Sequence, residues 1–116
     1  MSNQLPSLLG AALSVVSCAT PLGQAIEAFE EGRLPEAAQR FRSLAHDSPH
    51  FTPAERARYA LYAGLSELAL GDMSRADRWL IPLKRALDEN SAMLTAEERS
   101  ALLNALRSGG HMPGEP

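Results

Sequence analysis

The chain has 116 residues, enough for one compact domain, and its composition is rich in alanine and leucine but only 5% aromatic, which favours helices over strands. The formal net charge of -3 at pH 7 excludes a strongly basic nucleic-acid-binding protein, because such proteins neutralise phosphates with clustered Lys and Arg side chains. A single cysteine excludes an internal disulfide, and no apolar run is long enough for a membrane-spanning helix.

The N-terminal quarter of the chain differs from the remainder in charge, because Glu27 is the first charged side chain. Residues 8–17 form a run of about ten apolar or small residues, which suits the hydrophobic region of a signal peptide. The run ends at Cys18, and residues 15–18 (Val-Val-Ser-Cys) resemble the lipobox of bacterial lipoproteins. That resemblance implies a signal peptide over residues 1–18 and lipidation of Cys18. Because Ala19 follows the cysteine, it also implies an outer-membrane lipoprotein facing the periplasm.

A second interpretation makes residues 7–18 an extra N-terminal helix of the domain. The segment carries no Lys or Arg, although most signal peptides begin with a positive region, and Cys18 lies close to the next expected helix near Pro21. Small residues recur at three- and four-residue spacing, which suits close helix packing: Ser7, Gly10, Ser14 and Ser17. In this interpretation Cys18 is a small buried residue and the protein is cytoplasmic. A cleaved or disordered leader is a third alternative.

Two helices are expected between residues 20 and 48. Thr20 can cap the first, Pro21 fits its first position, and Gly32 ends it. The second starts at Pro35 and stops before Pro49, because proline lacks the backbone N–H that continues a helix. Apolar residues recur on one face of each helix, at Leu22, Ala25, Ile26 and Phe29 in the first and at Ala37, Ala38, Phe41, Leu44 and Ala45 in the second.

Two more helices are expected between residues 52 and 90. The third begins with the capping box Thr52-Pro53-Ala54-Glu55 and ends at Gly71. Ser74 with Asp77 opens the fourth, and Pro82 should kink or split it because one backbone hydrogen bond is lost. Their inward faces carry Ala60, Leu61, Gly64, Leu65 and Leu68 in the third helix and Ala76, Leu80, Leu83 and Leu87 in the fourth.

A last helix follows the capping box Thr95-Ala96-Glu97-Glu98. It presents Leu102, Leu103 and Leu106 on one face and finishes at Gly109-Gly110. Glu97 and Arg107 are among the charged side chains that it offers to solvent, so we expect it to cap the domain. Residues 109–116 are expected to form a flexible tail.

The strongest signal is an internal repeat, which appears when Gly32 is aligned with Gly71 at an offset of 39 residues (71 - 32 = 39). After each glycine a small residue follows at the fifth position, a large apolar residue at the ninth and another apolar residue at the twelfth. The matched pairs are Ala37 with Ala76, Phe41 with Leu80 and Leu44 with Leu83. Glycine permits a tight turn and alanine lets two backbones approach, so each copy indicates a pair of antiparallel helices.

This pattern resembles the tetratricopeptide family, whose repeat has roughly 34 residues. On that comparison Gly64 takes the small position of a first helix, Ala37 and Ala76 take the alanine position of the second helices, and Pro49 takes the closing proline. The resemblance covers roughly residues 21–90, with a longer period that residues 50–53 could absorb. It implies an all-α fold over residues 19–108, in which antiparallel helical hairpins stack as a short right-handed solenoid with a C-terminal capping helix.

No arrangement of side chains indicates catalysis. His46 and His50 are separated by Pro49, which breaks any helix that could present both as metal ligands on one face. No glycine-rich phosphate loop follows a strand, and no nucleophile has a recognisable base. We therefore expect no enzymatic activity, no catalytic residue, no metal and no cofactor.

The resemblance also implies where a partner binds, because the first helix of each tetratricopeptide repeat lines a concave groove. The implied partner-binding residues are Ile26, Phe29, Arg58, Leu61, Tyr62 and Leu65. Tyrosine and arginine dominate interface energies because they combine area with directed polar contacts. The alternative is that Leu61 and Leu65 are core residues and Tyr62 is half-buried. Trp79 either packs against the last helix or is an exposed anchor.

The function implied is that of a non-catalytic protein–protein interaction module, whose partner is another protein or peptide in a multi-protein complex and not a nucleic acid. One form of this hypothesis is a lipid-anchored scaffold or assembly factor of a bacterial envelope machine, similar in outline to small tetratricopeptide lipoproteins. The rival form is a soluble cytoplasmic adaptor or secretion chaperone of the same fold. A membrane-bound structural subunit with an uncleaved N-terminal helix is the third.

Overall fold

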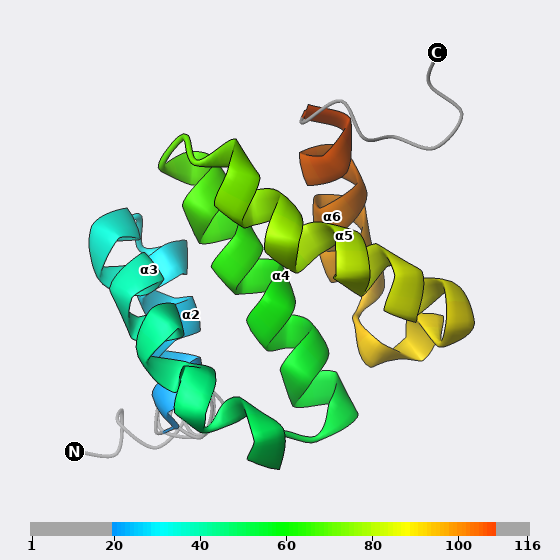
Figure 1. Ribbon diagram of the computed structural model, residues 1–116, viewed down its shortest axis with the longest axis horizontal. Coiled ribbons are helices and arrows are strands. Elements are labelled where there is room, and N and C mark those ends of the chain that lie inside the picture. Colours follow the sequence, from blue (N-terminus) through cyan, green and yellow to red (C-terminus); the bar gives the residue numbers. More distant parts are fainter. Residues whose placement is uncertain (1–19, 109–116) are drawn as a thin grey trace, which may run out of the picture.

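Residues 20–108 are described by the computed structural model, and this range is built from helices without any strand. Its α-helices are α2 (Pro21–Glu30), α3 (Leu34–Ser43), α4 (Pro53–Ala69), α5 (Met73–Glu89) and α6 (Ala96–Ser108). Three short 3-10 helices join them, namely η1 (Leu44–His46), η2 (Ser48–His50) and η3 (Ser91–Met93). The predicted all-α class is confirmed. Figure 1 shows α4 in the centre, with α2 and α3 on one side and α5 and α6 on the other.

Three of the predicted helix starts are confirmed by their capping hydrogen bonds. The hydroxyl of Thr20 accepts a backbone N–H from the first turn of α2 at 2.9 Å. Thr52 and Glu55 form the reciprocal capping box of α4, at 2.8 and 3.1 Å. Thr95 and Glu98 do the same for α6, at 3.0 and 3.1 Å. Each cap satisfies donors that a helix otherwise leaves without a partner, so local sequence fixes where these helices begin.

The start of α5 differs from the sequence-based expectation, and of the two outcomes expected at Pro82 the split does not occur. Its cap is Asp72, whose carboxylate accepts the backbone N–H of Arg75 at 3.0 Å, and not Ser74. The helix also runs unbroken through Pro82 to Glu89, so the proline does not split it. Burial explains this continuity, because leucines on both sides of the proline lie in the core and their packing outweighs one lost hydrogen bond.

Helix α3 is shorter than expected. It begins one residue before Pro35 and ends at Ser43, after which η1 and η2 carry the chain to His50. Leu44 remains buried, but Ala45, predicted on the same apolar stripe, is exposed because the chain leaves the α-helical path before it. The 3-10 turns therefore take the place of the last turn that the sequence suggested.

The turns at Gly32 and Gly71 have the same geometry. Gly32 has φ of 81° and Gly71 has φ of 87°, values that side chains with a Cβ rarely adopt. In the first turn the N–H of Gly32 donates to the carbonyl of Phe29, and the N–H of Arg33 donates to the carbonyl of Ala28. In the second turn Gly71 and Asp72 donate in the same way to Leu68 and Glu67, and all four distances are 2.9 to 3.0 Å. This is the Schellman pattern of helix termination, repeated at the 39-residue offset found in the sequence.

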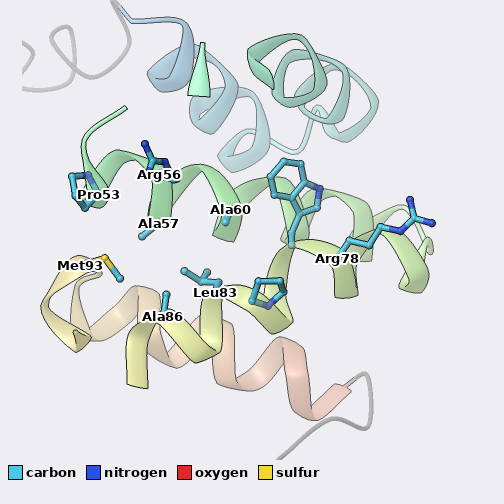
Figure 2. Close-up of a pocket in the computed structure, with 10 residues that line it drawn as sticks. Pro53, Arg56, Ala57, Ala60, Arg78, Leu83, Ala86 and Met93 are labelled. Carbon is cyan, nitrogen blue, oxygen red and sulfur yellow. The ribbon is translucent and has the colours of Figure 1, made fainter. Parts of the chain in front are cut away.

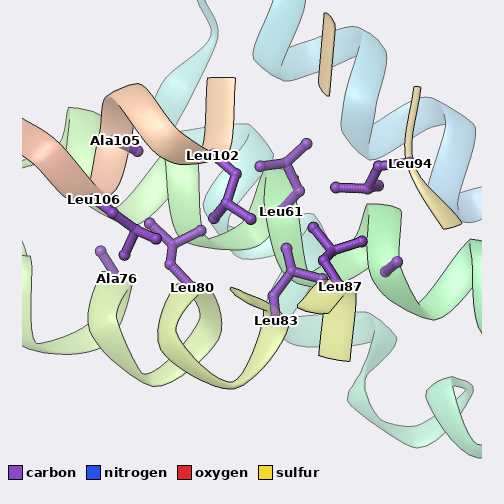
Figure 3. Packing of buried hydrophobic residues seen from close by; sticks show 10 residues of the cluster. Leu61, Ala76, Leu80, Leu83, Leu87, Leu94, Leu102, Ala105 and Leu106 are labelled. Carbon is purple, nitrogen blue, oxygen red and sulfur yellow. The ribbon is translucent and has the colours of Figure 1, made fainter. Parts of the chain in front are cut away.

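The core consists of two clusters on opposite faces of α4. The first cluster lies between α2, α3 and α4, and its buried members are Leu22, Ala25, Ile26, Ala28, Ala37, Phe41, Leu44, Tyr59 and Ala63. The second lies between α4, α5 and α6, and its buried members are Ala57, Leu61, Ala76, Leu80, Leu83, Leu87, Leu94, Leu102, Ala105 and Leu106. Figure 3 shows the leucines of the second cluster converging from these helices. Because α4 has neighbours on both sides, it buries two faces where the sequence suggested one.

Small residues mark the close helix contacts. Ala37 is 0% exposed and Ala76 is 1% exposed, as the repeat requires. At Gly64 an added Cβ would lie 2.5 Å from Cδ2 of Leu80 and 3.0 Å from Cβ of Trp79, so α4 and α5 approach too closely there for any side chain. The prediction of a packing role for these small residues is confirmed.

Candidate partner-binding surfaces

The six residues predicted to bind a partner occupy two different depths. Leu61 is 0% exposed and Ile26 is 4% exposed, so both lie in the core and support the surface from beneath. Phe29, Arg58, Tyr62 and Leu65 are partly exposed. Leu61 is therefore a core residue, which was the alternative to a binding role. Tyr62 is half-buried, as that alternative also suggested.

Three of the partly exposed residues, Phe29, Arg58 and Tyr62, take part in a bridge between three helices. The rings of Phe29 in α2 and Tyr62 in α4 meet edge to face, with centroids 5.7 Å apart and an interplanar angle of 66°. Glu98 in α6 completes the bridge, because its Oε2 accepts hydrogen bonds from Nε of Arg58 and from the hydroxyl of Tyr62, both at 3.1 Å. The predicted residues are thus brought together, through a carboxylate that the sequence identified only as a helix cap.

The electrostatics of this bridge follow from the shared carboxylate. Burial raises the pKa of Tyr62 to about 12, and the negative charge of Glu98 adds to the effect. Oε1 of Glu98 accepts the N–H of Thr95 while Oε2 serves the α4 side chains, so one carboxylate both caps α6 and fixes it to α4. The hydroxyl of Tyr62 and the carboxylate of Glu98 are therefore already paired within the molecule, and Phe29 and Leu65 add partly exposed apolar surface beside them.

A second candidate surface is the α4–α5 hollow, which has a volume of about 320 Å³. It is lined by Pro53, Arg56, Ala57, Ala60, Arg78, Trp79, Pro82, Leu83, Ala86 and Met93. Figure 2 shows Leu83 and Ala86 of α5 facing Ala57 and Ala60 of α4, with Met93 of η3 at one end. Since most of the lining is apolar and small, the hollow offers space to an apolar side chain.

A third candidate surface, the arginine hollow, adjoins the α4–α5 hollow and has a volume of about 400 Å³. It is lined by Arg42, Glu67, Arg75, Arg78 and Trp79, so it shares the last two residues with the α4–α5 hollow. Glu67 is 4% exposed, and both of its oxygens accept hydrogen bonds from Arg42 at 3.1 and 3.2 Å. The one carboxylate of this hollow is thus neutralised by the pair that joins α3 to α4.

Trp79 is half-buried and packs against both core clusters. Its indole meets the ring of Tyr59 in α4 edge to face, with centroids 4.9 Å apart. It also lines both hollows. Sequence reasoning missed the hollows, because they depend on how α4 and α5 diverge beyond Gly64. The sequence signal that could have indicated the α4–α5 hollow is the set of alanines on the two helices, Ala57, Ala60 and Ala86.

The described part of the chain holds no group of three or more His, Cys, Asp or Glu side chains that could bind a metal ion. His46 and His50 are exposed and lie in separate 3-10 helices. No helix within residues 20–108 combines the length and the apolar character needed to cross a bilayer.

The predicted lipidation site, Cys18, lies outside the described residues, as do the leader or extra helix expected over residues 1–18 and the tail expected over residues 109–116. No protein-family model, curated protein or solved structure matches this chain. The assignment of function therefore depends on the geometry of residues 20–108 and on the sequence pattern.

Proposed function

We propose that the chain is a non-catalytic protein–protein interaction module, made of two tetratricopeptide-like hairpins (α2–α3 and α4–α5) and a capping helix (α6). The observation that carries this proposal is the repetition of one hairpin geometry at the 39-residue offset. Both hairpins turn through a glycine with positive φ, bury an alanine five residues later and bury a large apolar side chain nine residues later. Stacked hairpins of this kind support extended binding surfaces, because each hairpin contacts only its neighbours.

The α2–α4–α6 face and the α4–α5 hollow both support a binding role. The α2–α4–α6 face presents the aromatic edge of Phe29 and Tyr62 together with Leu65. The α4–α5 hollow presents an apolar lining with arginines at its rim. Aromatic and arginine side chains beside apolar recesses are the features that carry most of the binding energy in protein interfaces.

Site-specific photocrosslinking tests the proposal in the native host. A photoreactive amino acid at position 65 lies on the same face of α4 as Arg58 and Tyr62, and one at position 107 in the last turn of α6 serves as the exposed control. We expect a discrete crosslinked partner from position 65 and none from position 107. Absence of any crosslink from position 65, and from position 86 in the α4–α5 hollow, would contradict an interaction module.

We further propose that the module is held at the outer membrane by lipid on Cys18, as a scaffold or assembly factor of an envelope machine. The support is the Val-Val-Ser-Cys motif after an uncharged, apolar segment. A soluble cytoplasmic adaptor or secretion chaperone is the alternative, favoured by the absence of Lys and Arg before Cys18. Labelling with a palmitate analogue that is lost in Cys18→Ser supports the anchor. Native protein with Met1 intact and no added lipid mass supports the adaptor.

A further inference from the structure

The α4–α5 hollow exists because two helices diverge from a point of very close contact. At Gly64 the backbones approach so closely that no Cβ fits against Leu80. Away from that point, toward the start of α4, the facing positions are Ala57 and Ala60 on one helix and Ala86 on the other. Methyl groups do not fill the widening space, which leaves about 320 Å³ open to solvent. This lies at the lower end of the range of about 300 to 1,000 Å³ that is typical of ligand-binding pockets.

Positive charge surrounds this apolar space. Arg56 and Arg78 line the α4–α5 hollow, and no carboxylate does. Within residues 20–108 no ion pair joins Arg78 to an acidic side chain, and Arg56 donates only to backbone carbonyls. The adjoining arginine hollow adds two guanidinium groups that are already paired, Arg42 with the buried Glu67 at 3.1 Å and Arg75 with Asp72 at 3.4 Å. The guanidinium groups of Arg56 and Arg78 therefore leave the α4–α5 hollow with a positive rim, although the chain has a net charge of -3.

Pro82, which also lines the α4–α5 hollow, removes one backbone donor from α5. Proline has no N–H, so it cannot donate the hydrogen bond that the carbonyl of Arg78, four residues earlier, would receive in a regular helix. Both residues line the α4–α5 hollow and so lie on the same face of α5.

From these observations we infer that the two hollows together bind an acidic polypeptide segment, which inserts one large apolar side chain beside Trp79. Its carboxylates bind Arg78 and the neighbouring guanidinium groups, which suit carboxylate geometry through paired N–H donors. The inference rests on the proposed function in that the occupant is another polypeptide. It uses a different face from Phe29, Arg58 and Tyr62. A nucleic acid fits less well, because the hollow itself is apolar and its basic rim is short.

The test begins with a random-sequence peptide display library screened against the full chain. The selected consensus peptide is then synthesised and titrated into the protein. Trp79 is the only tryptophan in the chain, so its fluorescence reports occupation of the hollows. We expect a consensus with Asp or Glu residues around one Phe, Leu or Trp, and binding that weakens as salt concentration rises.

Two variants and one matched control locate the site. Arg78→Glu should raise the Kd of the consensus peptide at least about tenfold, because it replaces an attractive charge with a repulsive one. Ala86→Phe should abolish the Trp79 response by filling the hollow without changing charge. Arg85→Glu makes the same charge change on the exposed side of the same helix and lines neither hollow. It should leave the Kd within about twofold.

Several results would overturn the inference. One is a selection that yields no peptide, or a consensus without acidic residues. Another is an Arg85→Glu effect as large as that of Arg78→Glu, or displacement of the peptide by a short oligonucleotide. Self-association in light scattering that is lost in Arg78→Glu would assign the hollows to a second copy of the chain. None of these results affects the crosslinks expected from position 65, so the interaction module itself can stand while this site fails.

Discussion

The α2–α3 hairpin and the α4–α5 hairpin are built around the same turn but differ in length. Helices α2 and α3 have 10 residues each, whereas α4 and α5 have 17 each. Under the 39-residue offset Pro82 corresponds to Ser43 (82 - 39 = 43), the last residue of α3. Helix α3 thus ends at the position equivalent to Pro82, whereas α5 continues past its proline to Glu89. The continuation survives because Leu83 and Leu87 pack against leucines of α6 and of the segment before it. Helix length here is set by neighbours and not by the turn.

The two hairpins also differ in the side chains that fill their cores. The first cluster buries Phe41 and Tyr59, and Phe29 and Phe51 pack at its edge. The second is made almost entirely of leucine and alanine. Short helices offer few inward positions, and aromatic side chains bury more area at each of them. The comparison suggests that the first hairpin depends on a few large residues, whereas the second spreads its stability over many.

The largest expected effect compares equivalent positions in the two cores. Phe41→Ala should lower the free energy of unfolding by about 4 kcal/mol, and Leu80→Ala by about 3 kcal/mol, because each leaves a cavity at a site that is 1% exposed. Urea unfolding followed by circular dichroism measures both. A smaller loss in Phe41→Ala than in Leu80→Ala would contradict the view that the first hairpin depends more on single residues.

The second prediction concerns the close contact between α4 and α5 at Gly64. Gly64→Val should destabilise by about 3 kcal/mol, because the new side chain meets Leu80, which is itself fully enclosed and cannot move away. Ala54→Val is the matched control, since it introduces the same residue on the exposed side of α4. It should cost less than about 1 kcal/mol through helix propensity alone. Equal losses in the two variants would show that the contact at Gly64 is not tight.

The smallest effect concerns the bridge between α2, α4 and α6. Tyr62→Phe removes a hydrogen bond to Glu98 and should cost about 1 kcal/mol at neutral pH. Thermal unfolding measures this loss, with Tyr59→Phe as the comparison in the first cluster. No loss in Tyr62→Phe would mean that Glu98 is held sufficiently by Arg58 and the cap.

The same bridge gives the molecule a dependence on alkaline pH. The pKa of Tyr62 is raised by burial from its usual value near 10 to about 12, so the unfolded chain loses the proton first. Stability contributed by the protonated form is complete below pH 10 and falls as pH rises toward about 12. Burial also raises the pKa of Tyr59, which should leave part of the decline in Tyr62→Phe. Urea unfolding at a series of alkaline pH values should therefore show a shallower decline in the variant.

Features decided within a few residues of the chain could be predicted from the sequence. The caps at Thr20, Thr52 and Thr95 and the turns at Gly32 and Gly71 depend on local hydrogen bonds, and all appear where expected. The cap of α5 was missed because Asp72 and Ser74 are both good capping residues two positions apart. The repeat alignment itself places Asp72 opposite Arg33, the cap position of α3, and this could have chosen between them.

Features decided between distant segments could not be predicted. The pairing of Arg42 with Glu67 and of Tyr62 with Glu98 joins residues that are 25 and 36 positions apart. No local rule selects such partners. The burial of Tyr59 was missed for a related reason, since its face of α4 becomes inward only once α3 packs there. The α4–α5 hollow is the hardest feature to predict, because its shape depends on the positions of all the side chains that surround it.

Tyr59 touches both hairpins at once, and this couples the hollows to the far side of the molecule. Its ring lies against Trp79 at 4.9 Å and near Phe41 at 6.3 Å, while its hydroxyl donates to the carbonyl oxygen of Phe41 at 2.9 Å. A ligand that moves the indole therefore changes a contact of the same ring whose hydroxyl holds α3. Thermodynamic linkage is reciprocal. If binding of the ligand changes the equilibrium for local opening of α3 by some factor, then opening of α3 changes the affinity for the ligand by the same factor. Hydrogen exchange along α3, which lines the site only through Arg42, would then report binding at the hollows.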